Sequence, residues 1–234
     1  MASQNKAVFW DFDGTLVIDS KWSGGLLQAL DALHPGHNQT HETLKANFSR
    51  RFPWHFAEKY HPELSAPEAW WNLVRPLLAE AVEKAGYNPK ESLLMAEMAH
   101  QSILRPDNYR LYDDTLPVLE NLKSKGWRHY IVSNNFPELA DIVRRMPFGN
   151  LFNGCISSGE VGYDKPNPGI FRYARYLAGN PEKVWMVGDN ITADVRGAES
   201  AGIPAILVRE PAKEPVAYHA PALEEAAEII ENNS

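Results

Sequence analysis

Short runs of apolar residues recur along the chain and are separated by stretches with helical periodicity. Four of these runs are rich in valine, isoleucine and aromatic residues, at positions 7–10, 130–132, 184–187 and 205–208. Strands buried on both faces of a parallel sheet have this length and composition, and 155–156 is a weaker candidate. Four helical patterns alternate with them, at 116–122, 171–177, 193–201 and 224–230. Asp114 or Thr115 is predicted to cap the first of these helices. The alternation predicts an α/β fold built on an open parallel sheet.

Residues 20–108 follow a different pattern, with helical stripes and no strand signal. Leu26, Leu30 and Leu33 lie on one helical face. Further helices are predicted at 41–52, 70–82 and 93–103, and Pro76 predicts a kink in the second of these. We therefore expect an all-α unit, here named the inserted helical segment (residues 20–108), between two parts of a core formed by residues 1–19 and 109–234.

Composition and charge exclude several classes of protein. The net charge of −7 argues against a nucleic-acid scaffold, which needs a basic surface. The single cysteine, Cys155, cannot form a disulfide within the chain, and a reducing compartment suits it. No apolar run reaches membrane-spanning length, and the N-terminus has no signal-peptide core. We expect a cytoplasmic protein that binds neither nucleic acid nor membrane, as a monomer or homodimer.

Acidic, hydroxyl and basic side chains follow the predicted strands at the point where each strand ends. In chain order they are Asp11 and Asp13, then Ser133 and Asn134, then Lys165, and finally Asp189 and Asp194. Ligands bind beyond the carboxyl ends of the strands in open parallel sheets, so these side chains should meet at one rim. One acid after a strand is usually a helix cap. The ordered series instead favours a catalytic site.

The paired acids Asp11 and Asp13 predict a cation beside them. A carboxylate is ionised at neutral pH and needs no base to act as a nucleophile, but a phosphate dianion repels it. A hard cation such as Mg²⁺ removes this repulsion and prefers oxygen ligands. We assign Asp11 as nucleophile and metal ligand and Asp189 as a second metal ligand. Asp13 is assigned as the acid that protonates the leaving oxygen and then deprotonates water.

The remaining side chains of the series suit phosphoryl binding and support. The Ser133 hydroxyl and backbone N–H groups near Asn134 can bind phosphoryl oxygens, and Lys165 can supply a fixed positive charge. Thr15 is expected to fix the turn after Asp13 by a hydrogen bond. Asp194 is expected to orient either metal-bound water or Lys165.

The motifs DFDGT, VSNN, KPNPGIF and GDNITADVRGAESAG occur in the order found in the haloacid dehalogenase superfamily. The chain resembles the phosphatase branch of that superfamily, which has a helical cap inserted after the first motif. The resemblance implies a Rossmann-like open parallel sheet core with an inserted all-α cap domain. It also implies the main-chain carbonyl of Asp13 as a metal ligand. The function implied is Mg²⁺-dependent hydrolysis of a small phosphorylated metabolite through a phosphoaspartyl intermediate.

Three alternatives remain at this point. A phosphomutase of the β-phosphoglucomutase type would share the core motifs and return the phosphoryl group to a second hydroxyl. A 2-haloacid dehalogenase typically lacks an acid at the position of Asp13. A non-catalytic binding module is the third, although it would be expected to lose one of the acids or Lys165. Arg50, Arg51 or Trp54 is a candidate contact for the leaving group.

Relatives in the superfamily often continue from the first motif directly to Asp-Ser. Here Ile18 comes before Asp19 and Ser20, so the hinge is expected to be one residue longer.

Overall fold

The computed structural model describes residues 5–18 and 20–233, and a parallel sheet forms its centre. The sheet has six strands in the order β3-β2-β1-β4-β5-β6, and all of its pairings are parallel. The α/β class is therefore confirmed, and each predicted run lies in a strand. The short edge strand β6 was not predicted. The strands are β1 (Lys6–Trp10), β2 (Arg128–Ser133), β3 (Phe152–Ser157), β4 (Lys183–Gly188), β5 (Ala205–Val208) and β6 (Tyr218–Ala220).

Helices cover both faces of the sheet. Ala7 and Phe9 of β1 belong to one buried cluster and Val8 and Trp10 to another, because successive side chains point to opposite faces. The first cluster includes α8 (Pro168–Leu177) and α9 (Gly197–Ser200). The second includes α5 (Thr115–Ser124), α6 (Leu139–Arg145) and α10 (Leu223–Asn232). Two-sided burial explains why these strands read as continuous apolar runs.

The predicted helix at 193–201 is divided in the structure. A π-helix spans Ile191–Arg196 and α9 follows it directly. Two short helices, α6 and α7 (Ser158–Val161), and the 3₁₀ turn η4 (Gly149–Leu151) were not predicted, because they are too short to show a clear period.

The inserted helical segment contains four α-helices and three 3₁₀ turns in its described part. Its third helix runs through Pro76, and its second ends at Asn47 because Phe48 adopts an extended conformation. Asp19, at the predicted hinge, lies outside the described residues. The elements are α1 (Lys21–Leu33), α2 (His41–Asn47), η1 (Pro53–Phe56), η2 (Pro62–Leu64), α3 (Pro67–Lys84), α4 (Pro89–Ile103) and η3 (Pro106–Asn108).

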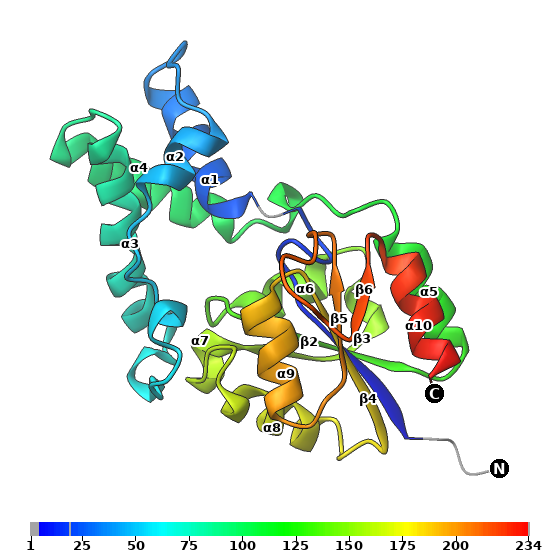
Figure 1. The fold of residues 1–234 in the computed structure, drawn as a ribbon. Coiled ribbons are helices and arrows are strands. Elements are labelled where there is room, and N and C mark those ends of the chain that lie inside the picture. The colour runs from blue at the N-terminus through cyan, green and yellow to red at the C-terminus, as the bar shows by residue number, and fades with distance from the viewer. Residues whose placement is uncertain (1–4, 19, 234) are drawn as a thin grey trace.

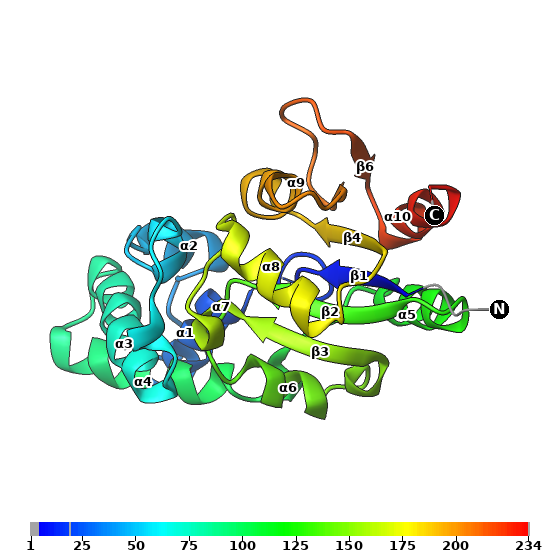
Figure 2. The same cartoon turned by 90° about the horizontal axis from the view of Figure 1, so that it is seen from below.

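The inserted helical segment stands apart from the sheet, on the side toward which the strands point (Figure 1). Figure 2 shows the arrows of β1, β3 and β4 directed toward it. It touches the core beside residues 158–169, where Tyr60 stacks on Tyr163 at 4.4 Å and Gly162 O accepts a hydrogen bond from His61 N at 2.8 Å. It touches again where Trp71 Nε1 donates to Glu138 at 3.1 Å. The carboxyl edge of the sheet therefore faces this segment.

Within the described residues, no helix combines the length and apolar character needed to cross a membrane.

A buried histidine joins β2 to its neighbours. His129 has no exposed surface, and its Nδ1 accepts a hydrogen bond from Trp10 Nε1 at 3.0 Å. Its Nε2 lies 3.0 Å from Leu119 O, so the ring is neutral with its proton on Nε2. Burial lowers the pKa of His129 from 6.5 to about 4.

This histidine should make stability depend on pH. As pH falls below 6.5, His129 becomes protonated in the unfolded chain, whereas in the folded chain it stays neutral until about pH 4. The free energy of unfolding therefore falls between pH 6.5 and 4. We expect a loss of roughly 3 kcal/mol in the free energy of unfolding from this group, measured by urea denaturation at intervals of pH. His129→Gln can make both hydrogen bonds without titrating, and its curve should be flatter. Equal slopes for the two proteins would contradict this.

Candidate active site

A tight turn after β1 presents the two aspartates. Asp11 N donates to Val187 O of β4 at 2.9 Å, which continues the sheet past the end of the strand. The chain then reverses, with Gly14 at φ +82° and its N–H bonded to Val17 O at 2.7 Å. A Cβ on Gly14 would overlap the carboxylate of Asp189. Glycine is therefore required for both the left-handed conformation and the close approach of the first and fourth strand ends.

A buried lysine joins the acids that follow β1 and β4. Lys165 Nζ lies 2.8 Å from Asp11 Oδ1 and 2.6 Å from Asp194 Oδ1, and the residue is only 2% exposed. Burial alone would lower the pKa of Lys165, but the two carboxylates outweigh it and raise this pKa above its usual value. The Asn134 side chain fixes the lysine backbone through two hydrogen bonds of 2.6 and 2.8 Å.

Three carboxylates share this one lysine. Oxygens of Asp11, Asp189 and Asp194 all lie within 4.8 Å of one another. Burial and repulsion from the other two raise the pKa of Asp189 to about 9. Burial raises the pKa of Asp194 to about 6 despite the attraction of Lys165. The cluster therefore carries more negative charge than the lysine offsets, and its oxygen donors suit a hard divalent cation.

The carboxylate of Asp13 lies outside this cluster. It forms an ion pair with Lys21 of α1, and Asn135 Nδ2 donates to the same oxygen at 2.8 Å. Asp13 was predicted to serve the metal through its main-chain carbonyl, and that role stays a prediction. The side chain is therefore held by partners other than Lys165, although both residues line the same cavity.

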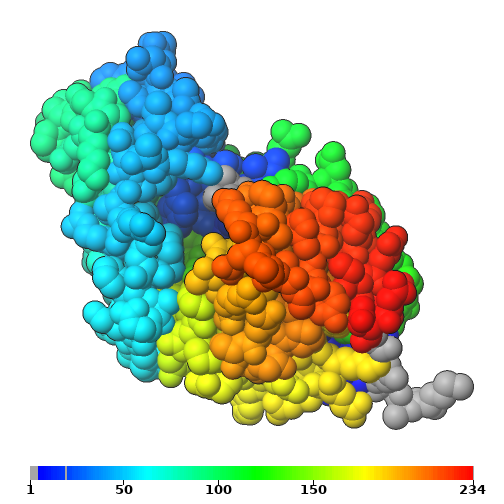
Figure 3. Space-filling view, in the orientation of Figure 1, coloured from blue at the N-terminus to red at the C-terminus, as the bar shows by residue number. Residues whose placement is uncertain are grey.

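Most of the predicted site residues meet around one cavity of about 270 Å³, but Thr15 and Asp194 are not among the described residues that line it. Figure 3 shows a hollow between the blue and cyan atoms of the inserted helical segment and the orange atoms after β5. The cavity also has Asn190 and Ala193 in its wall, and Ser133 there is 1% exposed. The predicted side chains that line it are Asp11, Asp13, Ser133, Asn134, Lys165 and Asp189.

The inserted helical segment adds Lys21, Trp22 and Trp54 to the cavity wall. Of the three predicted candidates for the leaving group, Trp54 reaches the cavity. Arg51 instead pairs with Glu80, and neither it nor Arg50 is among the described residues that line the cavity. The importance of Lys21 was missed, because a lysine at a helix start is usually solvated and only its closeness to the hinge could have suggested otherwise.

Arg209, which follows β5, holds the backbone of Thr15, whereas the Thr15 hydroxyl does not. Its Oγ1 is buried and has no hydrogen-bond partner among the described residues, so the predicted side-chain bond is not found. Its carbonyl oxygen accepts from Arg209 Nη2 at 3.1 Å, and Arg209 also pairs with Asp114 through contacts of 2.6 and 2.8 Å. Asp114 precedes α5 but makes no side-chain cap there. Its carboxylate binds Arg209 and Leu223 N instead.

Comparison with known proteins gives one family and a shared fold. The family model described as "haloacid dehalogenase-like hydrolase" matches residues 5–202. The phosphoserine phosphatase of Thermus thermophilus is 35% identical over 63% of this chain. That match covers 59% of the relative, so the chain spans little more than half of its length.

Two solved structures show the same fold over nearly the whole chain. The HAD-hydrolase YfnB of Bacillus subtilis, solved bound to magnesium, is 19% identical with a TM-score of 0.74 and covers 96% of this chain and 98% of its own. The L-2-haloacid dehalogenase of Xanthobacter autotrophicus is 22% identical with a TM-score of 0.72 and covers 97% and 98%. At these identities the likeness concerns the fold alone.

Loss of Arg209 should destabilise the protein. Arg209→Met leaves the half-buried Asp114 carboxylate without its guanidinium and Thr15 O without its donor. We expect a decrease of roughly 3 kcal/mol in the free energy of unfolding, measured by urea denaturation. Arg196→Met is the matched control, because the contacts of Arg196 with Glu199, Glu214 and Pro215 O are exposed, and its replacement should leave the free energy of unfolding nearly unchanged. Similar losses in both variants would refute the supporting role of Arg209.

Proposed function

Because the chain belongs to the haloacid dehalogenase-like hydrolases, we propose that it is a Mg²⁺-dependent phosphatase. Its substrate would be a small phosphomonoester metabolite, hydrolysed through a phosphoaspartyl intermediate. The observation that carries the proposal is that Asp11 and Asp13 are held by different partners. Asp11 lies with Lys165 in the acidic cluster, whereas Asp13 is held apart from that cluster by Lys21 and Asn135.

Asp11, Asp189 and the main-chain carbonyl of Asp13 would hold Mg²⁺. When bound, Mg²⁺ would reduce the repulsion between Asp11 and a phosphate dianion. The fit rests on the surplus of negative charge in the cluster. Asp194 gives one oxygen to Lys165 and accepts Asn190 N–H on the other at 3.0 Å, so its task is to hold the lysine and the chain after β4.

In the first step Asp11 acts as the nucleophile. Lys165 contacts Oδ1 of Asp11, which leaves Oδ2 to form the bond to phosphorus while the bond to the ester oxygen breaks. Ser133 and the backbone N–H groups beside Asn134 would hold the phosphoryl oxygens, with Lys165 balancing their charge.

Asp13 would handle the protons of both steps. It first donates a proton to the departing ester oxygen, which leaves as an alcohol. It then accepts a proton from the water that attacks phosphorus, so that inorganic phosphate leaves and Asp11 is regenerated. The contacts from Lys21 and Asn135 keep its carboxylate on the leaving-group side between these steps.

We propose that the inserted helical segment acts as a cap over a core formed by residues 1–19 and 109–234. Its contacts at Tyr163 and Glu138 allow it to close the cavity and exclude bulk water during transfer. Monomer or homodimer and a cytoplasmic location remain part of the proposal. The cavity of about 270 Å³ suits a small phosphorylated metabolite.

The alternatives use the same core in different ways. Retention of Asp13, fixed by two partners, favours ester hydrolysis over dehalogenation, which needs no proton donor there. A binding module would not need a buried lysine between ionisable acids. A phosphomutase would share every residue described for the core, so only its isomerised product separates it from a phosphatase.

A screen of phosphomonoesters tests the proposed function. With Mg²⁺ the protein should release inorganic phosphate from at least one small ester, and chelation by EDTA should abolish this because the acid cluster then repels the substrate. No chloride should appear from 2-chloropropionate, and no isomerised ester from hexose phosphates. Phosphate release that is unchanged by EDTA, or chloride release, would contradict the proposal.

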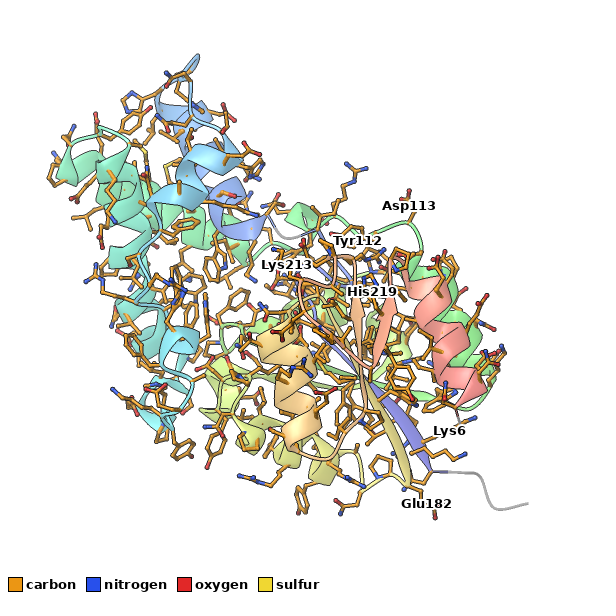
Figure 4. The ribbon with its side chains drawn as sticks, in the orientation of Figure 1. Lys6, Tyr112, Asp113, Glu182, Lys213 and His219 are labelled. Atoms are coloured by element: carbon orange, nitrogen blue, oxygen red, sulfur yellow. The ribbon has the colours of Figure 1, made fainter. Side chains whose placement is uncertain are left out.

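Replacement of the nucleophile tests the role of Asp11. Asp11→Asn keeps the shape of the side chain but removes its charge, and kcat/KM should fall at least about 10³-fold. Asp113→Asn is the matched control, because Asp113 is an exposed acid at the outer edge of the molecule (Figure 4) and its replacement should leave turnover within about twofold. Turnover by Asp11→Asn close to the wild-type value would remove Asp11 from the mechanism.

A further inference from the structure

A second buried lysine lies in the active-site cavity. The side chain of Lys21 is 5% exposed, and fully buried lysines are rare unless they are paired. Its partner is Asp13, and its Nζ also lies 5.0 Å from the ring centroid of Trp22. An ammonium group has three hydrogen-bond donors. Asp13 is its one hydrogen-bond acceptor within the described part of the chain, so Lys21 retains donor capacity.

The place of Lys21 relates it to the leaving group. Lys165 stands beside Asp11, where the phosphoryl group would bind. Lys21 stands beside Asp13, the residue assigned to the ester oxygen, and both lysines line the same cavity. A substrate whose phosphoryl group rests on Asp11 would therefore direct its alcohol portion toward Lys21.

Two indole rings complete this side of the cavity. Trp22 stacks on Trp70 at 5.9 Å and 24°, and Trp54 stacks on Phe52 at 4.7 Å and 18°. Both rings are thus fixed by packing within the inserted helical segment. They offer apolar surface to a carbon chain, and they add no anion that would compete for Lys21. An ammonium in such poorly solvated surroundings attracts an anion strongly.

Building on the proposed phosphatase function, we propose that Lys21 is a specificity-determining residue that binds an anionic group carried by the leaving alcohol. The short carbon chain between the ester oxygen and this anion would lie against Trp22 and Trp54. A carboxylate and a second phosphate share the required charge. The preferred substrates are therefore small phosphomonoesters of acidic alcohols rather than of neutral ones.

A purely internal role for Lys21 makes a different prediction. If the lysine only holds Asp13, it serves every substrate equally, and Asn135 already donates to the same Asp13 oxygen at 2.8 Å. A role in recognition instead affects charged and neutral leaving groups unequally. Matched pairs of substrates separate the two roles.

The test compares carboxymethyl phosphate with its neutral carboxamide, and ethylene glycol bisphosphate with 2-hydroxyethyl phosphate. For the wild-type protein with Mg²⁺, kcat/KM should favour the anionic member of at least one pair by at least about tenfold. The first pair reports a carboxylate and the second a phosphate. Lys21→Met should lower this ratio to about one, and Lys21→Arg should keep part of it, because the charge remains.

Lys213→Met is the matched control. Lys213 lies on the loop between β5 and β6 and lines a neighbouring cavity that also includes Asp189, so it is a nearby lysine outside the aromatic wall (Figure 4). Its replacement should leave the preference unchanged. The same preference should appear with ligands that are not themselves hydrolysed, as stronger competitive inhibition by glycolate than by glycolamide in the wild-type protein.

Two results would overturn the proposal. One is a wild-type kcat/KM ratio near one for both substrate pairs, together with equal inhibition by glycolate and glycolamide. This result is obtained with the wild-type protein alone and does not depend on the folding of a variant. The other is an equal loss for both members of the preferred pair in Lys21→Met, which would assign the lysine to Asp13 alone. In either case the wild-type protein would still hydrolyse phosphomonoesters, so the proposed phosphatase function would stand. Failure of that function would appear instead as no hydrolysis of any ester.

Discussion

The structure depends on a surplus of negative charge around one buried ammonium. Lys165 contacts Asp11 and Asp194 directly, while Asp189 adds a third carboxylate whose oxygens lie within 4.8 Å of the others. One positive charge could not offset three ionised carboxylates among buried groups. The raised pKa of Asp189 expresses that imbalance. A fold that served stability alone would have no use for such a cluster, and the proposed divalent cation would offset its charge.

Contacts between several strand ends hold this electrostatically unfavourable cluster in place. Asp11 N is bonded to β4, and Gly14 lets the first turn approach Asp189. Asn134 fixes the backbone of Lys165. Arg209, from the end of β5, holds the carbonyl of Thr15. Each support crosses between different strand ends, so the sheet order brings the charges together and the loops keep them there.

The sequence predicted the parts of the site that follow strands and left out those that depend on long-range contacts. Asp11, Ser133 and Asp189 could be found because each lies within two residues of the end of an apolar run whose direction is fixed by parallel pairing. Asp114 was predicted, with Thr115 as the alternative, to cap a helix, yet its carboxylate binds Arg209, 95 residues away along the chain. The same limit applies to Lys21, because no local pattern distinguishes it from a solvated lysine. Its burial appears only when the inserted helical segment is placed over the carboxyl edge of the sheet.

The most direct test of this account is a calorimetric titration of the metal-free protein with Mg²⁺, with Asp189→Asn as the comparison. The account predicts that the wild-type chain binds one ion and that the amide variant, although folded, binds it at least about tenfold more weakly, because a neutral amide both lowers the negative charge of the cluster and is a poorer ligand. Equal affinity in the two proteins, or no binding to the wild-type chain, would contradict the claim that the cluster is built for a cation.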